Sequence, residues 1–233
     1  MNNIDILIYS LPKTGGNTLR NTLEHFNFKT YYTHDKYFFQ AKFPGQNNSI
    51  SLKKYIENNS ENKKLTIITV YRDSFFRNIS LFFQSFEYKY KLDINNITVE
   101  SLIDIYNSNL QNNYNEKNGL FETFPNELTE FKFDHTKKYS LWESGNIRFV
   151  VLRYNDINSW PDILSNIFDI ECKQLKNSNY SPSKKYYNVY KKFLNTYKIN
   201  NIEFEKLINS IELDIFFTED EKNKYIESIK EKN

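Results

Sequence analysis

The stretch IDILIYSLPKTGGNTLRNTLEHF, residues 4–26, indicates a strand, a tight loop and a helix in direct succession. Its first part, Ile4–Ser10, is an apolar run of strand length. Leu19, Leu23 and Phe26 are spaced by four and three residues, which places them on one face of a helix. The loop between these parts contains the chain's only two adjacent glycines. A strand that leads into a helix in this way favours an α/β fold.

Three further segments predict strands. Leu65–Tyr71 (LTIITVY) is apolar and rich in β-branched residues, as expected of a strand buried on both faces of a parallel sheet. Ile147–Arg153 is a second clear strand in this part of the chain, and Lys29–Thr33 is a short one. Helices are expected at residues 51–58, 73–90, 98–110, 125–133 and 156–168, and in two or three segments after residue 184. Because strands alternate with helices, we expect a three-layer α/β/α fold with a central parallel sheet, in a single domain of residues 1–233.

The composition excludes several classes of protein. With 39% hydrophobic and 26% charged residues the chain is globular rather than disordered. Its apolar runs are far shorter than the roughly 20 residues of a membrane span, so no transmembrane segment is expected. No basic and apolar leader precedes Ile4, and we therefore expect no secretory signal.

Cysteine and charge content indicate the compartment and the partners. The single cysteine, Cys172, excludes an internal disulfide, and with only three histidines it argues against a structural zinc site. These features predict a cytoplasmic protein. The net charge of +2 gives no reason to expect a nucleic-acid partner.

The loop at residues 10–18 has the features of a phosphate-binding loop. It joins the carboxyl end of a strand to the start of a helix, where unpaired backbone N–H groups and the helix dipole favour an anion. Glycines let the backbone approach the phosphate oxygens, and the lysine adds a positive charge. The residues expected to bind the phosphate are Pro12, Lys13, Thr14, Gly15, Gly16, Asn17 and Thr18.

This loop is not a Walker A motif. That motif requires a glycine directly before its lysine and another five residues earlier, where this chain has Pro12 and Leu7. Pro12 has no backbone N–H to donate, which would damage a β/γ-phosphate cradle. The plain alternative is a Gly-Gly loop without a ligand.

Pro-Lys-Thr-Gly followed by Asn-Thr-Leu resembles the 5′-phosphosulfate loop of sulfotransferases that use 3′-phosphoadenosine-5′-phosphosulfate (PAPS). The resemblance implies the P-loop NTPase-like sulfotransferase fold, with PAPS as the donor of a sulfuryl group. Lys13 would then neutralise charge on the oxygen that bridges sulfate and the departing phosphate.

A second motif resembles the same family. Its members bind the 3′-phosphate with an arginine after a buried strand and a serine eight residues later, and Arg72 and Ser80 stand at those positions. An arginine at the carboxyl end of a strand is able to pair with a phosphate through two hydrogen bonds. The family's usual proline after Arg-Asp is Ser74 here. The alternative is that Arg72 and Arg77 are solvated helix-end charges and that Ser80 only packs.

A third stretch, Asn177–Tyr190, falls where sulfotransferases have a mobile loop over the nucleotide. Lys184 and Lys185 are candidates for contacting the 3′-phosphate. The stretch also resembles, at Lys185 and Tyr187 only, the NKWYS motif of capsular-polysaccharide synthesis proteins. The alternative is a helix start with solvated lysines.

Sulfuryl transfer needs a base for the acceptor hydroxyl, and histidine is the side chain best suited near neutral pH. His34 follows the short second strand, hence the edge at which parallel sheets bind ligands, and is the preferred base. Glu24 and His135 are the fallbacks. No acidic cluster has metal-ligand spacing, so no metal is expected; Asp73 is the nearest carboxylate that a kinase would use.

Taken together, these motifs predict a cytoplasmic sulfotransferase that acts on a hydroxyl acceptor, with a carbohydrate or polysaccharide preferred by analogy to the capsule proteins. Residues 91–146, including Trp142, are expected to shape the acceptor pocket. Two alternatives stay open: another P-loop phosphotransferase that uses ATP or GTP with Mg²⁺, and a nucleotide-binding module without catalytic activity.

Overall fold

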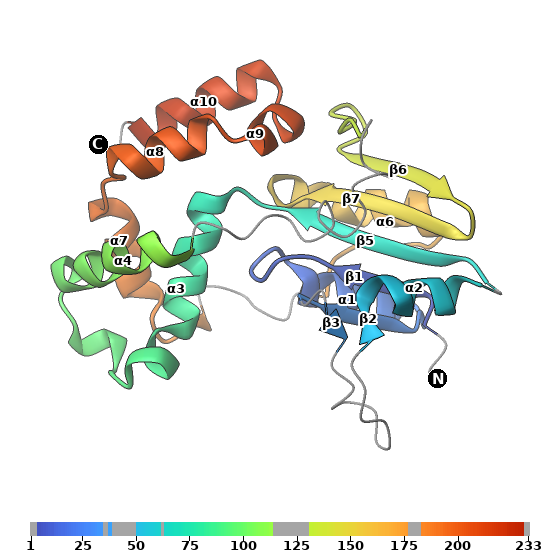
Figure 1. Ribbon diagram of the computed structural model, residues 1–233, viewed down its shortest axis with the longest axis horizontal. Helices are drawn as coiled ribbons and strands as arrows, with labels where there is room; N and C mark the ends of the chain where they lie inside the picture. Colours follow the sequence, from blue (N-terminus) through green and yellow to red (C-terminus); the bar gives the residue numbers. More distant parts are fainter. Residues whose placement is uncertain are drawn as a thin grey trace. The chain divides into compact units, whose positions relative to one another are not determined.

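The computed structural model describes residues 4–34, 37–38, 50–61, 63–113, 131–176 and 183–230. The chain forms two compact units (Figure 1). The sheet unit comprises Met1–Tyr71 and Lys117–Ser178, and the helical unit comprises Arg72–Glu116 and Asn179–Asn233. That the whole chain is a single domain stays a prediction.

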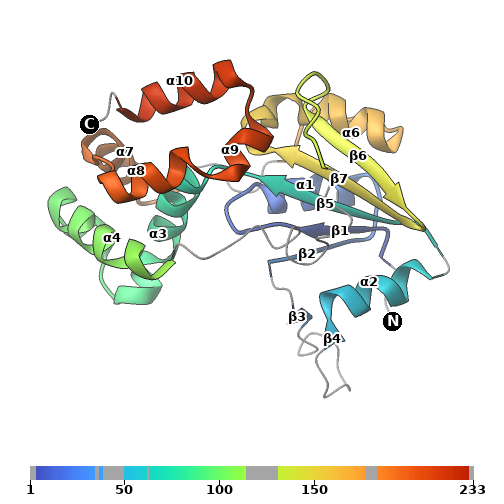
Figure 2. The same cartoon turned by 45° about the horizontal axis from the view of Figure 1, so that its top comes forward.

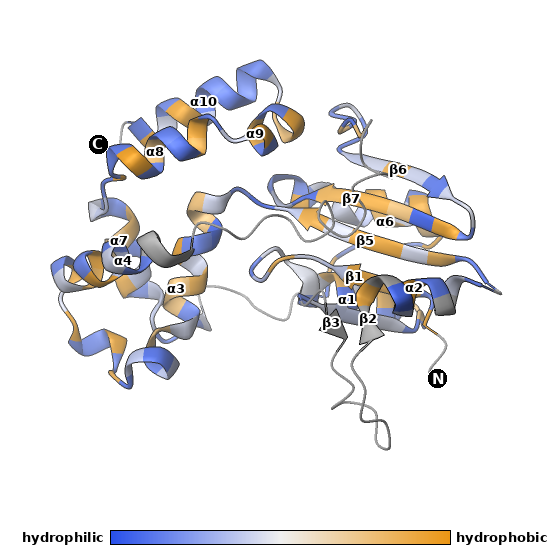
Figure 3. Ribbon diagram, in the orientation of Figure 1, coloured by the Kyte–Doolittle hydropathy of each residue, from blue (hydrophilic) through white to orange (hydrophobic). Residues whose placement is uncertain are grey.

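A five-stranded, mostly parallel sheet forms the centre of the sheet unit, and the predicted α/β class is confirmed (Figure 2). The strand order is β2-β1-β5-β7-β6. The four parallel strands are β1 (Ile6–Tyr9), β2 (Thr30–Thr33), β5 (Leu65–Tyr71) and β7 (Ile147–Arg153). Every residue of β1 and β5 is buried, which explains why both are largely apolar. Figure 3 shows this hydrophobic character along β5 and β7.

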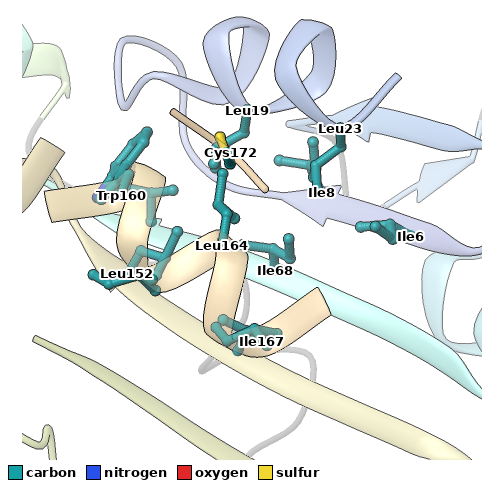
Figure 4. Close-up of a cluster of buried hydrophobic side chains, with 13 residues drawn as sticks. Ile6, Ile8, Leu19, Leu23, Ile68, Leu152, Trp160, Leu164, Ile167 and Cys172 are labelled. Carbon is teal, nitrogen blue, oxygen red and sulfur yellow. The ribbon is translucent and has the colours of Figure 1, made fainter. Parts of the chain in front are cut away.

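Helices flank the sheet. On one face α1 (Gly16–His25) and α6 (Trp160–Phe168) pack against alternate strand residues, in the core that Figure 4 shows. Ile68 and Val70 of β5 belong to this core, so Ile67 and Thr69 point to the opposite face. There α2 (Leu52–Ser60) contacts β5. A separate antiparallel pair is formed by β3 (Tyr37–Phe38) and β4 (Ile50–Ser51).

The sequence analysis missed the short pair β3 and β4 and one strand of the five-stranded sheet, which makes that sheet mixed rather than wholly parallel. Strand β6 (Tyr139–Ser144) runs antiparallel to β7, with Ser144 opposite Ile147. The two-residue turn between them contains Gly145, whose φ is 56°. A Gly-Asn pair between two strand-like runs is a hairpin signal. Trp142, predicted to shape an acceptor pocket, stacks on Phe149 of β7 at 5.1 Å.

Two expected helices differ from the structure. Residues 154–159 form a 3-10 segment, η3 (Tyr154–Ser159), and the α-helix begins only at Trp160. Of the helix expected at residues 125–133, positions 125–130 lie outside the described residues, and positions 131–133 have no helical structure.

The helical unit has an aromatic core. Phe193 packs edge-on against Phe83 at 5.2 Å and against Tyr106 at 5.6 Å, and it stacks on Tyr197 at 5.1 Å. The helices of this unit are α3 (Ser74–Tyr90), η2 (Ile94–Asn96), α4 (Val99–Asn113), α7 (Tyr187–Thr196), α8 (Asn201–Ile208), α9 (Ile211–Phe216) and α10 (Glu219–Lys230). Within the described ranges, no helix has the length and apolar content needed to cross a membrane.

Candidate functional site

The strand order defines where a ligand is expected. From β1 the chain passes through α1 to β2 on one side, whereas β5 and then β7 follow on the other side of β1. Open parallel sheets bind ligands at the carboxyl ends of the two strands where the order reverses, here β1 and β5. The loop at residues 10–15 leaves β1 at this edge, and Arg72 follows directly after the last residue of β5. The lysine loop and Arg72 therefore follow two adjacent parallel strands, at the same edge of the sheet.

Hydrogen bonds made by two hydroxyl groups of the loop itself hold the loop after β1 in its conformation. Thr14 is buried, and its hydroxyl donates to the carbonyl oxygen of Leu11 at 2.8 Å. The Ser10 hydroxyl lies 3.0 Å from the same Thr14 oxygen. Lys13, between the ends of this turn, has a φ of 67°, a left-handed conformation that a lysine adopts only when its surroundings require it. The Thr14 hydroxyl thus shapes the loop from inside.

Packing explains both glycines, and Gly15 is also favoured by its backbone conformation. Gly15 has a φ of 90°, and a Cβ there would lie 2.9 Å from the ring of Trp160. A Cβ on Gly16 would lie 2.3 Å from the ring of Tyr32. The sequence analysis assigned these glycines to close approach of a phosphate, whereas the structure shows that they also let α1 begin close to β2 and α6.

The start of α1 has no side-chain cap. Its N-cap residue is Gly15, so no side chain there accepts a hydrogen bond from the first turn. Asn17 and Thr18 lie in this turn, the former half-buried and the latter buried. An uncapped helix start suits an anion, because it presents backbone N–H groups and the positive end of the dipole.

His34 is joined to this loop. Its Nδ1 lies 2.7 Å from the carbonyl oxygen of Ser10. A carbonyl oxygen only accepts, so Nδ1 carries the hydrogen, and in the neutral ring Nε2 keeps the lone pair. The ring is exposed and packs edge-on against Tyr32 at 4.6 Å. The predicted base and the predicted phosphate loop are thus held together, with the basic nitrogen directed away from the bond to Ser10.

The two fallback bases lie elsewhere in the sheet unit. Glu24 accepts a hydrogen bond of 2.7 Å from Thr30, the first residue of β2, and therefore lies at the opposite edge of the sheet. His135 contacts the Phe133 ring at 5.3 Å and precedes β6, whose first residue pairs with Leu152 of β7. That position is near the carboxyl end of β7, two strands away from β1.

Asp73, in the helical unit, has a structural task. Its carboxylate is the N-cap of α3 and accepts from the Phe76 amide at 2.9 Å and from the Tyr225 hydroxyl at 2.8 Å. Burial raises the pKa of this carboxyl, while these hydrogen bonds and the nearby charges of Arg72 and Arg77 oppose the rise. No cluster of three or more His, Cys, Asp or Glu side chains able to hold a metal occurs in the described ranges.

A buried arginine, Arg77, lies between the two residues of the second motif in the sequence. Arg72 and Ser80 are half-buried, whereas Arg77 on α3 is only 4% exposed. The alternative that both arginines are solvated helix-end charges is therefore wrong for Arg77. Its burial was not predicted, because burial of a charge on a helix depends on tertiary packing and leaves no local sequence signal.

The third predicted stretch is described only from residue 183 onward, and Asn177–Pro182 lie outside the described residues. Lys184 is half-buried just before α7. The Nζ of Lys185 lies 2.5 Å from Oε2 of Glu87 on α3, and this bond raises the pKa of the lysine. Any contact of Lys185 with a phosphate would have to compete with Glu87.

A buried ion pair near the loop was missed. At the carboxyl end of β7, Arg153 is 4% exposed and makes two hydrogen bonds to Asp156, of 2.7 and 3.1 Å. Its carbonyl oxygen accepts from Nε1 of Trp160 at 3.2 Å. Because Trp160 packs on Gly15, this pair supports the wall of the loop.

Comparison of the chain with models of protein families, with curated proteins and with solved structures finds no match. The chemical argument therefore depends on the site itself. The site combines an uncapped helix start, a lysine in a constrained loop, and a histidine whose tautomer is set by that loop. Such a group is able to bind a phosphate-like anion and to accept a proton nearby.

Proposed function

We propose that the chain is a PAPS-dependent sulfotransferase with the P-loop sulfotransferase fold, acting in the cytoplasm on the hydroxyl of a carbohydrate or polysaccharide. The observation that supports this most is the parallel pairing of β1 with β5. Because of this pairing, the lysine loop and the Arg72 segment begin at the same edge of the sheet. In the proposal, this edge holds the two ends of an adenosine bisphosphate. The bond from His34 to Ser10 supports a base at the same edge.

In the proposed reaction the acceptor oxygen attacks the sulfur of PAPS. The bond between sulfur and the bridging oxygen breaks, and adenosine 3′,5′-bisphosphate leaves with that oxygen. Lys13 and the amides at the start of α1 stabilise the charge that develops on this oxygen. Removing one such donor from an active site lowers the turnover number about 10²–10³-fold. The acceptor proton passes to Nε2 of His34, which is the nitrogen with the lone pair when Nδ1–H is bonded to Ser10.

Arg72 and Ser80 are assigned to the 3′-phosphate, by their match to the family motif. This chemistry needs no metal. The use of Asp73 as a helix cap counts against the kinase alternative, because its carboxylate already accepts two hydrogen bonds within the helical unit.

The proposal is tested by transfer of labelled sulfate from PAPS to carbohydrate and small-molecule acceptors without added Mg²⁺. Lys13→Ala is expected to lower the turnover number about 100-fold or more, because a preorganised positive charge at the leaving oxygen is lost. Lys173→Ala is the matched control, since Lys173 is an exposed lysine of the sheet unit that pairs with Glu171. Equal turnover by the two variants would overturn the role of Lys13, and absence of transfer to every acceptor would overturn the function.

A further inference from the structure

The last helix of the chain, α10, is bonded to the start of α3, next to Arg72, within the helical unit. The Tyr225 hydroxyl donates a hydrogen bond of 2.8 Å to Oδ1 of Asp73, across 152 positions of the sequence. The same carboxylate oxygen accepts from the backbone N–H of Phe76 at 2.9 Å, because Asp73 is the N-cap of α3. One oxygen atom therefore holds both the first turn of α3 and a side chain of α10.

The contact between Tyr225 and Asp73 is buried. Asp73 is 3% exposed and Tyr225 is 9% exposed. The Tyr225 ring lies 6.4 Å from the ring of Phe76 and 5.3 Å from the ring of Phe217. Because water has little access here, loss of the Tyr225 hydroxyl would leave the carboxylate oxygen with one donor fewer and without a ready replacement.

Asp73 lies between the two residues that are assigned to the 3′-phosphate. Arg72 directly precedes this cap, whereas Ser80 lies within α3, about two helical turns after it. The backbone N–H of Arg77 donates to the Asp73 carbonyl oxygen at 3.2 Å and so belongs to the first turn. The conformation of Asp73 therefore sets the spacing between Arg72 and Ser80.

Helix α10 has a cap of its own. The backbone N–H of Thr218 donates to Oε2 of Glu221 at 3.0 Å, and the backbone N–H of Glu221 donates to the Thr218 hydroxyl at 3.3 Å. This reciprocal pair is a capping box, which stabilises the start of a helix. The bond from Tyr225 is thus not needed to start α10, and we expect its loss to act mainly on Asp73.

We propose that Tyr225 is a positioning residue for nucleotide binding, which acts through Asp73 to hold Arg72 and Ser80 at the spacing that the 3′-phosphate requires. The inference rests on the proposed function, because that function assigns Arg72 and Ser80 to the 3′-phosphate. Tyr225 acts through the cap of α3 and takes no part in the transfer itself.

The test compares Tyr225→Phe with Tyr197→Phe. Tyr225→Phe removes the hydroxyl and keeps the ring that packs against Phe217. Tyr197→Phe is the matched control in the same unit, because the Tyr197 hydroxyl also donates to a buried carboxylate, that of Glu203, at 2.6 Å. The Tyr197 ring stacks on Phe75 of α3 at 6.1 Å, and phenylalanine keeps this contact. Each variant thus loses a hydrogen bond from a tyrosine to a buried carboxylate, and the bond lost in Tyr225→Phe is the one to the cap of α3.

Calorimetric titration with two nucleotides separates positioning from a general loss of stability. Adenosine 3′,5′-bisphosphate has the 3′-phosphate, whereas adenosine 5′-phosphate lacks it. Tyr225→Phe is expected to weaken binding of the bisphosphate about 3- to 10-fold, the effect of one hydrogen bond, and to leave binding of the 5′-phosphate unchanged. Tyr197→Phe is expected to bind both nucleotides as the wild type does.

Two results would overturn the proposal. In the first, Tyr225→Phe binds the bisphosphate as tightly as Tyr197→Phe. In the second, Tyr225→Phe loses affinity for both nucleotides to the same extent, which would show that its hydroxyl does not act on the 3′-phosphate.

Failure of the proposed function gives a different result, because the wild type would then bind no bisphosphate. In that case hydrogen exchange of the Phe76 and Arg77 amides tests the contact with Asp73 by itself. Faster exchange in Tyr225→Phe than in Tyr197→Phe supports the positioning of the α3 cap by Tyr225, and equal exchange in the two variants contradicts it.

Discussion

Strands β5 and β7 are parallel neighbours, and each leads into an arginine at the same edge of the sheet. Tyr71 is in register with Arg153, so Arg72 lies one residue beyond that position along its chain. Arg153 is buried and held by both oxygens of Asp156. The acid beside Arg72, in contrast, caps α3. The two arginines thus differ in what the neighbouring carboxylate does: Asp156 binds Arg153, whereas Asp73 caps α3.

The largest expected effect concerns the structural arginine. Arg153→Ala leaves Asp156 as a buried charge without its partner and is expected to lower the free energy of unfolding by about 3–5 kcal/mol. Chemical denaturation measures this change. The double variant Arg153→Met with Asp156→Asn removes both charges and should recover most of the loss. A single variant as stable as the wild type would show that the pair does not support the sheet unit.

Arg72, which is proposed to bind the 3′-phosphate, should affect ligand binding instead. Arg72→Ala is expected to weaken binding of adenosine 3′,5′-bisphosphate about 10- to 100-fold, the effect of losing hydrogen bonds to a charged group. Calorimetric titration measures the affinity. Arg148→Ala is the control, because Arg148 lies near the amino end of β7 and pairs with Glu143. If Arg72→Ala binds the bisphosphate as tightly as this control, the proposed role of Arg72 in ligand binding is contradicted.

Asp73, the N-cap residue beside Arg72, is expected to make the stability of the chain depend on pH. Because burial raises the pKa of Asp73 above its ordinary value of 3.8, the folded chain holds this proton more tightly than the unfolded chain. The Asp73 contribution to the free energy of unfolding is therefore full at low pH and is lost as pH rises from 3.8 through the raised pKa.

Asp73→Asn keeps a side-chain oxygen for the cap and removes the titration. Denaturation curves over this pH range should therefore be flatter for the variant than for the wild type. A pH profile that is identical in the two proteins would mean that Asp73 does not titrate as described.

The parts of the fold that could be predicted are those with a strong local signal. Leu65–Tyr71 and Ile147–Arg153 are apolar and β-branched, and both strands begin and end at the predicted residues. The weakly alternating run Tyr139–Ser144 was missed, because its pairing with β7 is a tertiary contact with only a short turn signal.

Some features of the candidate site could likewise be predicted from the sequence, and others could not. The position of the lysine loop and of His34 at the ends of β1 and β2 follows from the strand pattern, and it was predicted. Which aromatic ring lies over Gly16, and which nitrogen of His34 bonds to Ser10, depend on how β1, β2 and α1 pack. The sequence therefore indicated which segments lie at this edge of the sheet, while the contacts of Tyr32 with Gly16 and His34 required the structure.

The most direct test of the central claim is a calorimetric titration of the wild-type chain with adenosine 3′,5′-bisphosphate in the absence of Mg²⁺, beside a titration with ATP and Mg²⁺. We expect one bisphosphate to bind per chain without metal, more tightly than ATP, and to lose affinity in both Lys13→Ala and Arg72→Ala. No binding of bisphosphate, or undiminished binding by either variant, would contradict the claim that the lysine loop and Arg72 hold the two ends of one nucleotide.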